Sequence, residues 1–287
     1  MLALAFVVFL SSVNLSFASD IQPWPGPDWM RAKDLSYLGD FEKNLSGAHW
    51  DSELQTLYLV INKPATIWAY KRLSNEFKLV KKIRAKGDYE GITKVGSLAN
   101  DVFVMGEKCA CIIRYDLKSG KKLRVYKLRK FMPNDGGAGP EGLAFIPNRF
   151  LDKSIGHGQG TFGGLFVVGH QEGGDLFFFD LASDSKKIRF VRQVPTRADE
   201  SSGLEFEASQ GRLYIWHNTG PNSIEIVEPT LVAGGRLKLV RHIEGPKGGN
   251  VEGIAVGSVA SGEKYLFFTD DDNQDGVALF WYENTAI

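Results

Sequence analysis

Three glutamates of this 287-residue chain stand in the same local context, in which an acidic residue is followed by glycine and an apolar run. They are Glu90, Glu141 and Glu252. Ser46 and Ser202 take the same place in two further copies, so the motif occurs five times. Carboxylates are hard ligands that suit Ca²⁺, which takes about six to eight oxygen atoms. If the copies converge in the fold, these residue types favour the binding of a hard cation.

The spacing of the motif indicates how the copies could converge. Successive motif glycines lie 44, 51, 61 and 50 residues apart. After the second copy come strand-like runs at 101–105, 109–115 and 122–128, rich in β-branched and aromatic residues. Four short strands recurring at a period of roughly 40–50 residues are typical of β-propeller blades. We therefore predict an all-β fold, a five-bladed β-propeller of four-stranded antiparallel blades.

The two ends of the chain predict how the ring closes. The last repeat supplies strand-like runs at 252–256, 264–269 and 277–282, but no fourth strand. An orphan run at 34–41 precedes the first repeat, and we predict that this N-terminal strand completes the last blade. Such pairing removes two exposed sheet edges. A sixth, degenerate blade is the alternative, but the residues ahead of Ser46 are too few to form one.

The first 19 residues are apolar and end in the small-x-small signal Ser16-Phe17-Ala18, which is typical of a secretory signal peptide. A retained N-terminal anchor helix is the alternative, because the run carries no Lys or Arg. We expect residues 20–33 to be a linker and residues 34–287 to form a single propeller domain. The expected location is secreted or periplasmic, with membrane attachment only if the N-terminal segment is retained.

The charge balance bears on the binding partners, and the two cysteines bear on cross-linking. The chain has 34 basic and 34 acidic residues, which argues against nucleic acid as a partner. We expect a monomer that binds an unidentified ligand or protein at the mouth of the propeller axis. Cys109 and Cys111 fall on one predicted strand, where a disulfide would be strained, so we expect two small buried cysteines.

The propeller geometry predicts where the motif residues gather. The innermost strands line the central channel, so the motif residues should ring one mouth, together with the turns after the second strands. Those turns contain Asn62, Glu107, His170 with Glu172, His217 with Asn218, and Asp270 with Asp271 and Asp272. Three glutamates on one axis cannot all stay ionised without a cation or raised pKa values.

We therefore predict Glu90, Glu141 and Glu252 as metal ligands, with Glu200, Asp270 and Asp271 as further candidates. The alternative is that Glu-Gly is a turn that starts a strand and that the acidic run at 269–276 is a plain turn. His170 and His217 are candidate catalytic bases or ligands.

Four registers of the motif resemble the SdiA-regulated family of predicted periplasmic proteins, over roughly residues 34–283. They are Asp88-Tyr-Glu-Gly-Ile92, Gly139-Pro-Glu-Gly-Leu-Ala144, Glu200-Ser-Ser-Gly-Leu204 and Asn250-Val-Glu-Gly-Ile-Ala255. The resemblance implies a five-bladed propeller distantly similar to NHL repeats, with calcium bound here at the three motif glutamates. The chain departs from the pattern at Ser46 and in a Gly-rich insertion at 146–164. A weaker similarity runs to phytase-like and gluconolactonase-like propellers, which are hydrolases with axial calcium.

The candidate residues and the resemblance are compatible with two functions. The first is a secreted or periplasmic calcium-binding module that recognises a ligand or partner at the axial mouth. The alternative is a metal-dependent hydrolase, phosphoesterase-like or lactonase-like, in which the cation polarises the substrate and Glu, His170 or His217 activates water. The sequence contains no nucleophile elbow, P-loop or zinc motif. We favour the binding module.

Overall fold

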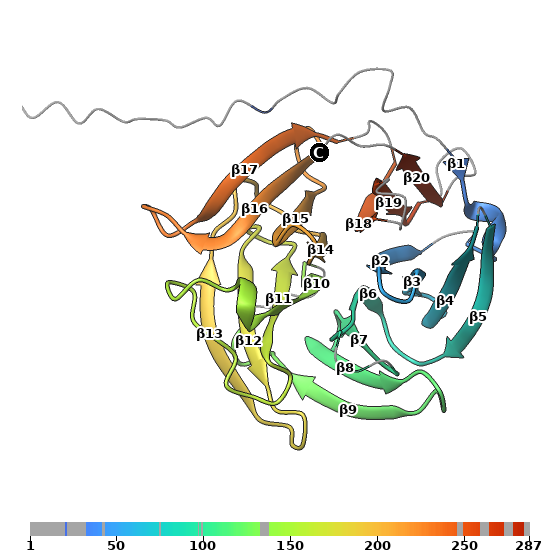
Figure 1. Cartoon of the computed structure of the whole chain (residues 1–287), viewed down its shortest axis with the longest axis horizontal. Coiled ribbons are helices and arrows are strands. Elements are labelled where there is room, and N and C mark those ends of the chain that lie inside the picture. Colours follow the sequence, from blue (N-terminus) through green and yellow to red (C-terminus); the bar gives the residue numbers. More distant parts are fainter. Residues whose placement is uncertain are drawn as a thin grey trace, which may run out of the picture.

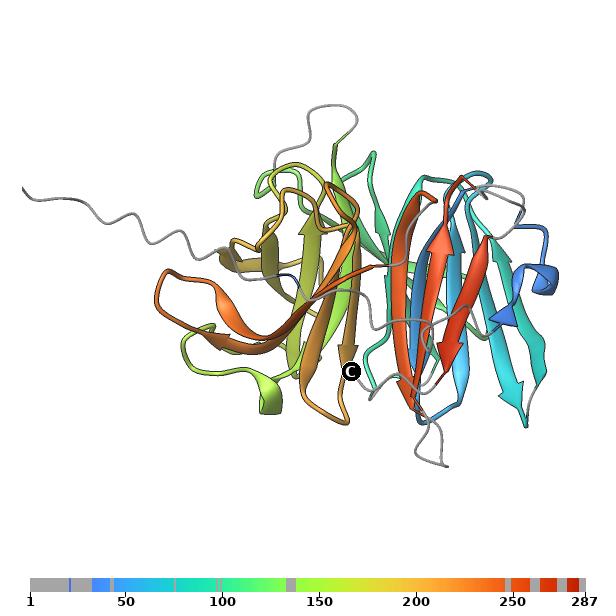
Figure 2. The same cartoon turned by 90° about the horizontal axis from the view of Figure 1, so that it is seen from above.

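Five four-stranded antiparallel sheets surround a central axis in the computed structural model (Figure 1). The structure describes residue 21 and residues 33–283, except 42–43, 75, 97, 99, 133–137, 246–248, 259–263 and 273–277. The predicted signal peptide and nearly all of the linker lie outside the described residues. Figure 2 views the ring from its side, with the strands running between its two faces. The predicted five-bladed propeller is confirmed.

Each blade runs from an innermost strand at the axis to an outermost strand at the rim (Figure 1). The first blade contains β2 (Leu45–Asp51), β3 (Thr56–Ile61), β4 (Thr66–Leu73) and β5 (Glu76–Arg84). The second contains β6 (Tyr89–Thr93), β7 (Asp101–Gly106), β8 (Cys111–Asp116) and β9 (Lys122–Lys127). The third contains β10 (Pro140–Pro147), β11 (Gly164–His170), β12 (Leu176–Leu181) and β13 (Ile188–Val194).

The fourth blade contains β14 (Gly203–Glu207), β15 (Arg212–His217), β16 (Ser223–Leu231) and β17 (Leu237–Glu244). The fifth is built from both ends of the chain, in the order β18 (Val251–Ser258), β19 (Lys264–Asp270), β20 (Leu279–Glu283) and β1 (Lys33–Asp34). The N-terminal strand therefore completes the last blade, as predicted.

The closing strand is shorter than expected. Only Lys33 and Asp34 pair with β20, and a 3-10 helix, η2 (Ser36–Leu38), follows. The Asp34 side chain accepts the backbone N–H of Ser36 at 2.8 Å, which turns the chain out of the strand. The prediction of a strand over 34–41 is wrong beyond Asp34. Buried Leu35 anchors the segment, and its N–H bonds the carbonyl of Leu279.

Apolar clusters fill the five interfaces between neighbouring blades. Between the first and fifth blades, Trp50 stacks on Phe267 with ring centroids 5.5 Å apart. Between the second and third blades, Phe103 packs against Phe166 at 4.8 Å. Aromatic pairs at such distances add to the apolar area that each interface buries. Because the clusters close a ring, each blade is held on both sides.

The motif glycines set how closely the innermost strands approach one another. A Cβ built on each would lie 2.3 to 3.0 Å from the carbonyl oxygen of the motif residue in the next blade. Gly47 faces Glu90, Gly91 faces Glu141, Gly142 faces Ser202, Gly203 faces Glu252, and Gly253 faces Ser46. Contact around the whole axis therefore depends on the absence of a side chain at all five positions.

The two cysteines form a disulfide, so the expectation of two unlinked cysteines is wrong. Cys109 lies in the turn before β8, whereas Cys111 is the first residue of that strand. Ala110 between them has a φ of 43°, so the pair does not follow strand geometry. Their Cα atoms are 5.2 Å apart, within the range that a disulfide spans.

No helix in the described part of the chain is long and apolar enough to cross a membrane.

Gly91→Ala should lower the free energy of unfolding by about 1–3 kcal/mol, because its Cβ would lie 2.4 Å from the Glu141 carbonyl oxygen. Gly96→Ala is the matched control, since a Cβ there would meet nothing within 4 Å. Urea unfolding of both variants measures the difference. Equal stability of the two variants would contradict the close-contact ring.

Candidate metal centre

In four of the five blades, a backbone hydrogen bond brings the turn after the second strand to the start of the first strand. The N–H of Glu107 bonds the carbonyl of Asp88 at 3.1 Å, and the N–H of Asp271 bonds that of Asn250 at 3.0 Å. In the same way, the N–H of Asn62 bonds the carbonyl of Asn44 at 2.9 Å, and the N–H of Gln171 bonds the carbonyl of Gly139 at 3.0 Å. The motif residues and these turns therefore share one mouth of the axis, which we call the acidic mouth.

Asp88, Glu90 and Glu107 form the tightest acidic cluster in the described part of the chain. Each offers a carboxylate oxygen, and the three oxygens lie within 4.8 Å of one another. Asp88 and Glu90 are buried, and Glu107 is half-buried. This Asp/Glu triad could hold a metal ion.

Two members of this triad were not predicted as ligands. Asp88 is two residues before Glu90, so both side chains leave the extended chain on the same side. That spacing is visible in the sequence and could have identified Asp88. Glu107 was expected at this mouth, but only the hydrogen-bonded turn brings its carboxylate to the other two.

The other motif glutamates lie within electrostatic range of this triad. Burial, followed by the charges of Glu252 and Glu90, raises the pKa of Glu141 well above its usual range. Burial and the charge of Asp271 raise the pKa of Glu252 to about 9. Burial, together with the charges of Asp88 and Glu107, raises the pKa of Glu90 to about 7. Burial and neighbouring carboxylates thus disfavour the charged forms of all three motif glutamates.

The three further candidates differ in how they are held. The Asp270 carboxylate accepts the N–H groups of Asn250 and Asp272, at 3.3 and 3.0 Å, so it stabilises the turn. Glu200 is buried and accepts the Ser202 hydroxyl at 3.1 Å. Asp271 lies close enough to Glu252 to raise its pKa. Asp271 therefore lies near the motif glutamate Glu252, whereas the Asp270 carboxylate is used in hydrogen bonds to the backbone of its turn.

Buried oxygen atoms without a hydrogen-bond donor are concentrated at the acidic mouth. Among the described residues, six buried side-chain oxygens have no hydrogen-bond partner, and all belong to this mouth, although Asp88 Oδ1 lies 3.7 Å from Lys63 Nζ. They are Ser46 Oγ, Asn62 Oδ1, Asp88 Oδ1, Glu141 Oε2, Gln171 Oε1 and Asp271 Oδ1. Burying a polar group without a partner costs free energy. A cation could serve as a shared partner for oxygens that converge in this way.

A small cavity lies on the axis beside these groups. Its volume is about 10 Å³, and Glu90, Glu252 and Ser202 line it with residues of all five innermost strands. Such a volume has room for about one water molecule or ion. The axis is therefore packed rather than open at this depth.

The two candidate histidines are enclosed. His217 is fully buried, with Nδ1 at the Glu200 carbonyl (2.5 Å) and Nε2 at Glu225 (3.3 Å). His170 is also fully buried, and its Nδ1 lies 2.9 Å from the carbonyl of Glu172. These contacts fix the ends of β11 and β15, which is a structural use of both rings.

In the metal-free protein, the melting temperature should fall as the pH rises from about 5 to about 9. Folded Glu90 and Glu252 have pKa values of about 7 and about 9, above the 4.5 of an ordinary glutamate. Between these values the folded chain keeps protons that the unfolded chain has lost, so raising the pH favours unfolding. Thermal melts in EGTA measure the slope, which Glu252→Gln should flatten. A wild-type melting temperature that stays constant or rises would contradict the assignment.

Comparisons with known proteins agree with the fold and with the predicted resemblance. Glutaminyl cyclase from Myxococcus xanthus has a TM-score of 0.54 and 14% identity, over 84% of this chain and 90% of that chain. A chain of the nidogen/laminin complex has a TM-score of 0.48 and 16% identity, over 85% of this chain and 86% of that chain. At such identities the likeness to the cyclase shows the fold alone.

No curated protein matches the sequence. The sequence profile of the SdiA-regulated family matches residues 30–150, which contain the first two blades and β10. This stretch includes Ser46, Glu90 and Glu141 with their glycines. The predicted resemblance to the SdiA-regulated family is therefore confirmed over residues 30–150.

Proposed function

We propose that the acidic mouth binds Ca²⁺ and that the chain acts as a calcium-binding β-propeller that recognises a ligand or partner there. The observation that carries this proposal is the convergence of buried oxygens without donors on one mouth. The acidic triad adds three carboxylates, of which Asp88 is paired with two lysines, Lys63 at 3.7 Å and Lys108 at 2.5 Å. A divalent cation offsets both the missing hydrogen bonds and the repulsion between carboxylates.

The chemistry of the side chains favours calcium over other cations. The candidate ligands are carboxylate, amide and hydroxyl oxygens, which calcium accepts in large number and flexible geometry. Zinc prefers nitrogen and sulfur, and the histidines nearest this mouth are already hydrogen-bonded. Magnesium demands near-octahedral geometry and keeps its waters, which suits a crowded, buried mouth poorly.

Bound calcium would join different blades. Asp88, Glu90 and Glu107 belong to the second blade, Glu141 to the third and Glu252 to the fifth. The triad would hold the ion, and the other two glutamates would contribute charge from across the axis. A cation in this position stabilises the ring and presents a positive centre to oxygen-bearing groups of a ligand or partner.

We also propose a secreted or periplasmic location. The disulfide between Cys109 and Cys111 supports it, because disulfides persist in oxidising compartments. The apolar N-terminal segment points in the same direction.

The hydrolase alternative gains no specific support from the geometry. A general base must reach the proton that it removes, whereas His170 and His217 are fully buried and hydrogen-bonded to the protein. We therefore keep the binding module as the proposed function.

Calcium titration of EGTA-treated protein by calorimetry tests the proposal. Wild type should bind Ca²⁺ saturably, and Glu90→Gln and Glu107→Gln should each weaken binding by about tenfold or more. Glu76→Gln is the control, because Glu76 is exposed on the outer strand β5. Absence of saturable binding by wild type, or wild-type affinity in both triad variants, would overturn the proposal.

A further inference from the structure

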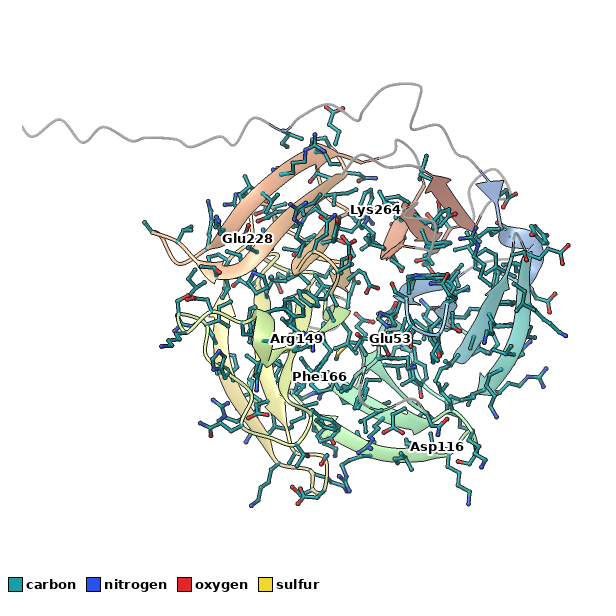
Figure 3. The ribbon with its side chains drawn as sticks, viewed as in Figure 1. Glu53, Asp116, Arg149, Phe166, Glu228 and Lys264 are labelled. Carbon is teal, nitrogen blue, oxygen red and sulfur yellow. A yellow bond between two sulfur atoms is a disulfide. The ribbon has the colours of Figure 1, made fainter. Side chains whose placement is uncertain are left out.

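A second cavity opens at the opposite mouth of the axis, where the first strand of each blade turns into the second. Its volume is about 470 Å³, within the range of small-molecule sites. It is lined from all five blades, by residues that include His49, Lys94, Phe145, Glu207 and Val256. In Figure 3, Glu53 and Arg149 of this lining lie near the centre of the ring. None of these groups belongs to the proposed calcium centre.

The Gly-rich insertion of the third blade forms one wall of this cavity. Arg149 follows β10 within the 3-10 helix η3 (Asn148–Phe150), and Phe162 precedes β11. The loop is fixed, because the Asn148 side chain bonds the N–H and the carbonyl of Gly158, both at 2.8 Å. This departure from the family pattern therefore gives the cavity a preformed side.

A buried carboxylate orients the histidine of the cavity. His49 Nδ1 lies 3.0 Å from both carboxylate oxygens of Glu205, which is 2% exposed. The Trp50 N–H also points to Glu205, at 3.4 Å. Because Glu205 accepts the Nδ1 proton, the ring presents Nε2 on its other edge. Nε2 has no hydrogen-bond partner among the described residues.

The acidic groups of the lining are already engaged, apart from Glu53 at the exposed rim. Asp51 accepts Lys94 Nζ at 2.7 Å and the N–H groups of Glu53 and Leu54. Glu207 accepts the Tyr214 hydroxyl at 2.9 Å and lies 3.2 Å from Lys264. These carboxylates have little capacity left for a ligand's donors.

In contrast to these carboxylates, a hydrogen-bond donor of the cavity lining remains available to a ligand. Arg149 lies over the ring of Phe150, 4.7 Å from its centroid, and makes no hydrogen bond to the described residues. Its guanidinium carries five N–H donors in a fork that matches a carboxylate. Together with His49, it favours an anion over a cation as the occupant. Phe145, Phe162 and Phe206 add apolar walls for the body of a ligand.

We propose that this cavity is a second binding site, independent of calcium, for a small organic carboxylate with an apolar or aromatic body. In its protonated, imidazolium form, His49 donates Nδ1–H to the Glu205 carboxylate and Nε2–H to the carboxylate of the ligand. Arg149 binds the ligand's oxygens at the rim, and the phenylalanines cover its apolar part. Glu205 is a positioning residue that acts through His49.

Three probes with the same body test the proposal by calorimetry: benzoate, benzyl alcohol and benzylamine. Each is titrated into the full protein, once in EGTA and once in saturating Ca²⁺. Benzoate should bind saturably, equally well in both buffers, and about tenfold or more tighter than the other two probes. His49→Gln and Arg149→Leu should each weaken benzoate binding by about tenfold. Glu90→Gln at the opposite mouth is the control and should bind benzoate like wild type.

Several results would overturn this inference. They are no saturable benzoate binding up to about 10 mM, equal or tighter binding of benzylamine or benzyl alcohol, and wild-type binding by both the His49 and the Arg149 variants. Benzoate binding that requires Ca²⁺ and disappears in Glu90→Gln would assign the ligand to the acidic mouth instead. Because Arg149 is exposed, its variant remains informative even if His49→Gln fails to fold.

Discussion

The close approach of the five innermost strands is the constraint on which the rest of the structure depends. Each motif glycine lies against the carbonyl of the motif residue in the next blade, and the last contact returns to Ser46 in the first blade. Side chains at these positions would force the strands apart. With glycine, the axial cavity shrinks to about 10 Å³, and the residues just before the glycines converge on one mouth.

That convergence places several carboxylates close together, where they repel one another and where a cation would be favoured. Burial first, and then the charges of neighbouring carboxylates, raise the pKa values of Glu141 and Glu252. The apolar clusters between blades stabilise the ring against this repulsion, and a cation would remove the repulsion itself. At the opposite mouth, Asp51 and Glu207 of the cavity wall are instead paired with Lys94 and Lys264, and Arg149 is left available for a ligand.

Much of this fold could be predicted because the repeated motif marks the same structural position in each blade. The ring, its closure by the N-terminal strand and the acidic mouth all follow from that periodicity. Other features depend on where strands end: Cys109 lies just outside β8, which permits the disulfide, and the closing strand stops at Asp34. The pairing of His49 with Glu205 joins residues 156 positions apart and carries no local motif, so only the folded ring reveals it.

Anomalous diffraction from crystals grown with Mn²⁺ or Tb³⁺ in place of Ca²⁺ tests most directly whether the acidic mouth is a cation site. We predict one strong anomalous peak at the acidic mouth, in contact with Asp88, Glu90 and Glu107, that is lost from crystals of Glu90→Gln. A peak at another place on the chain, or a wild-type mouth without a peak at saturating metal, would contradict it.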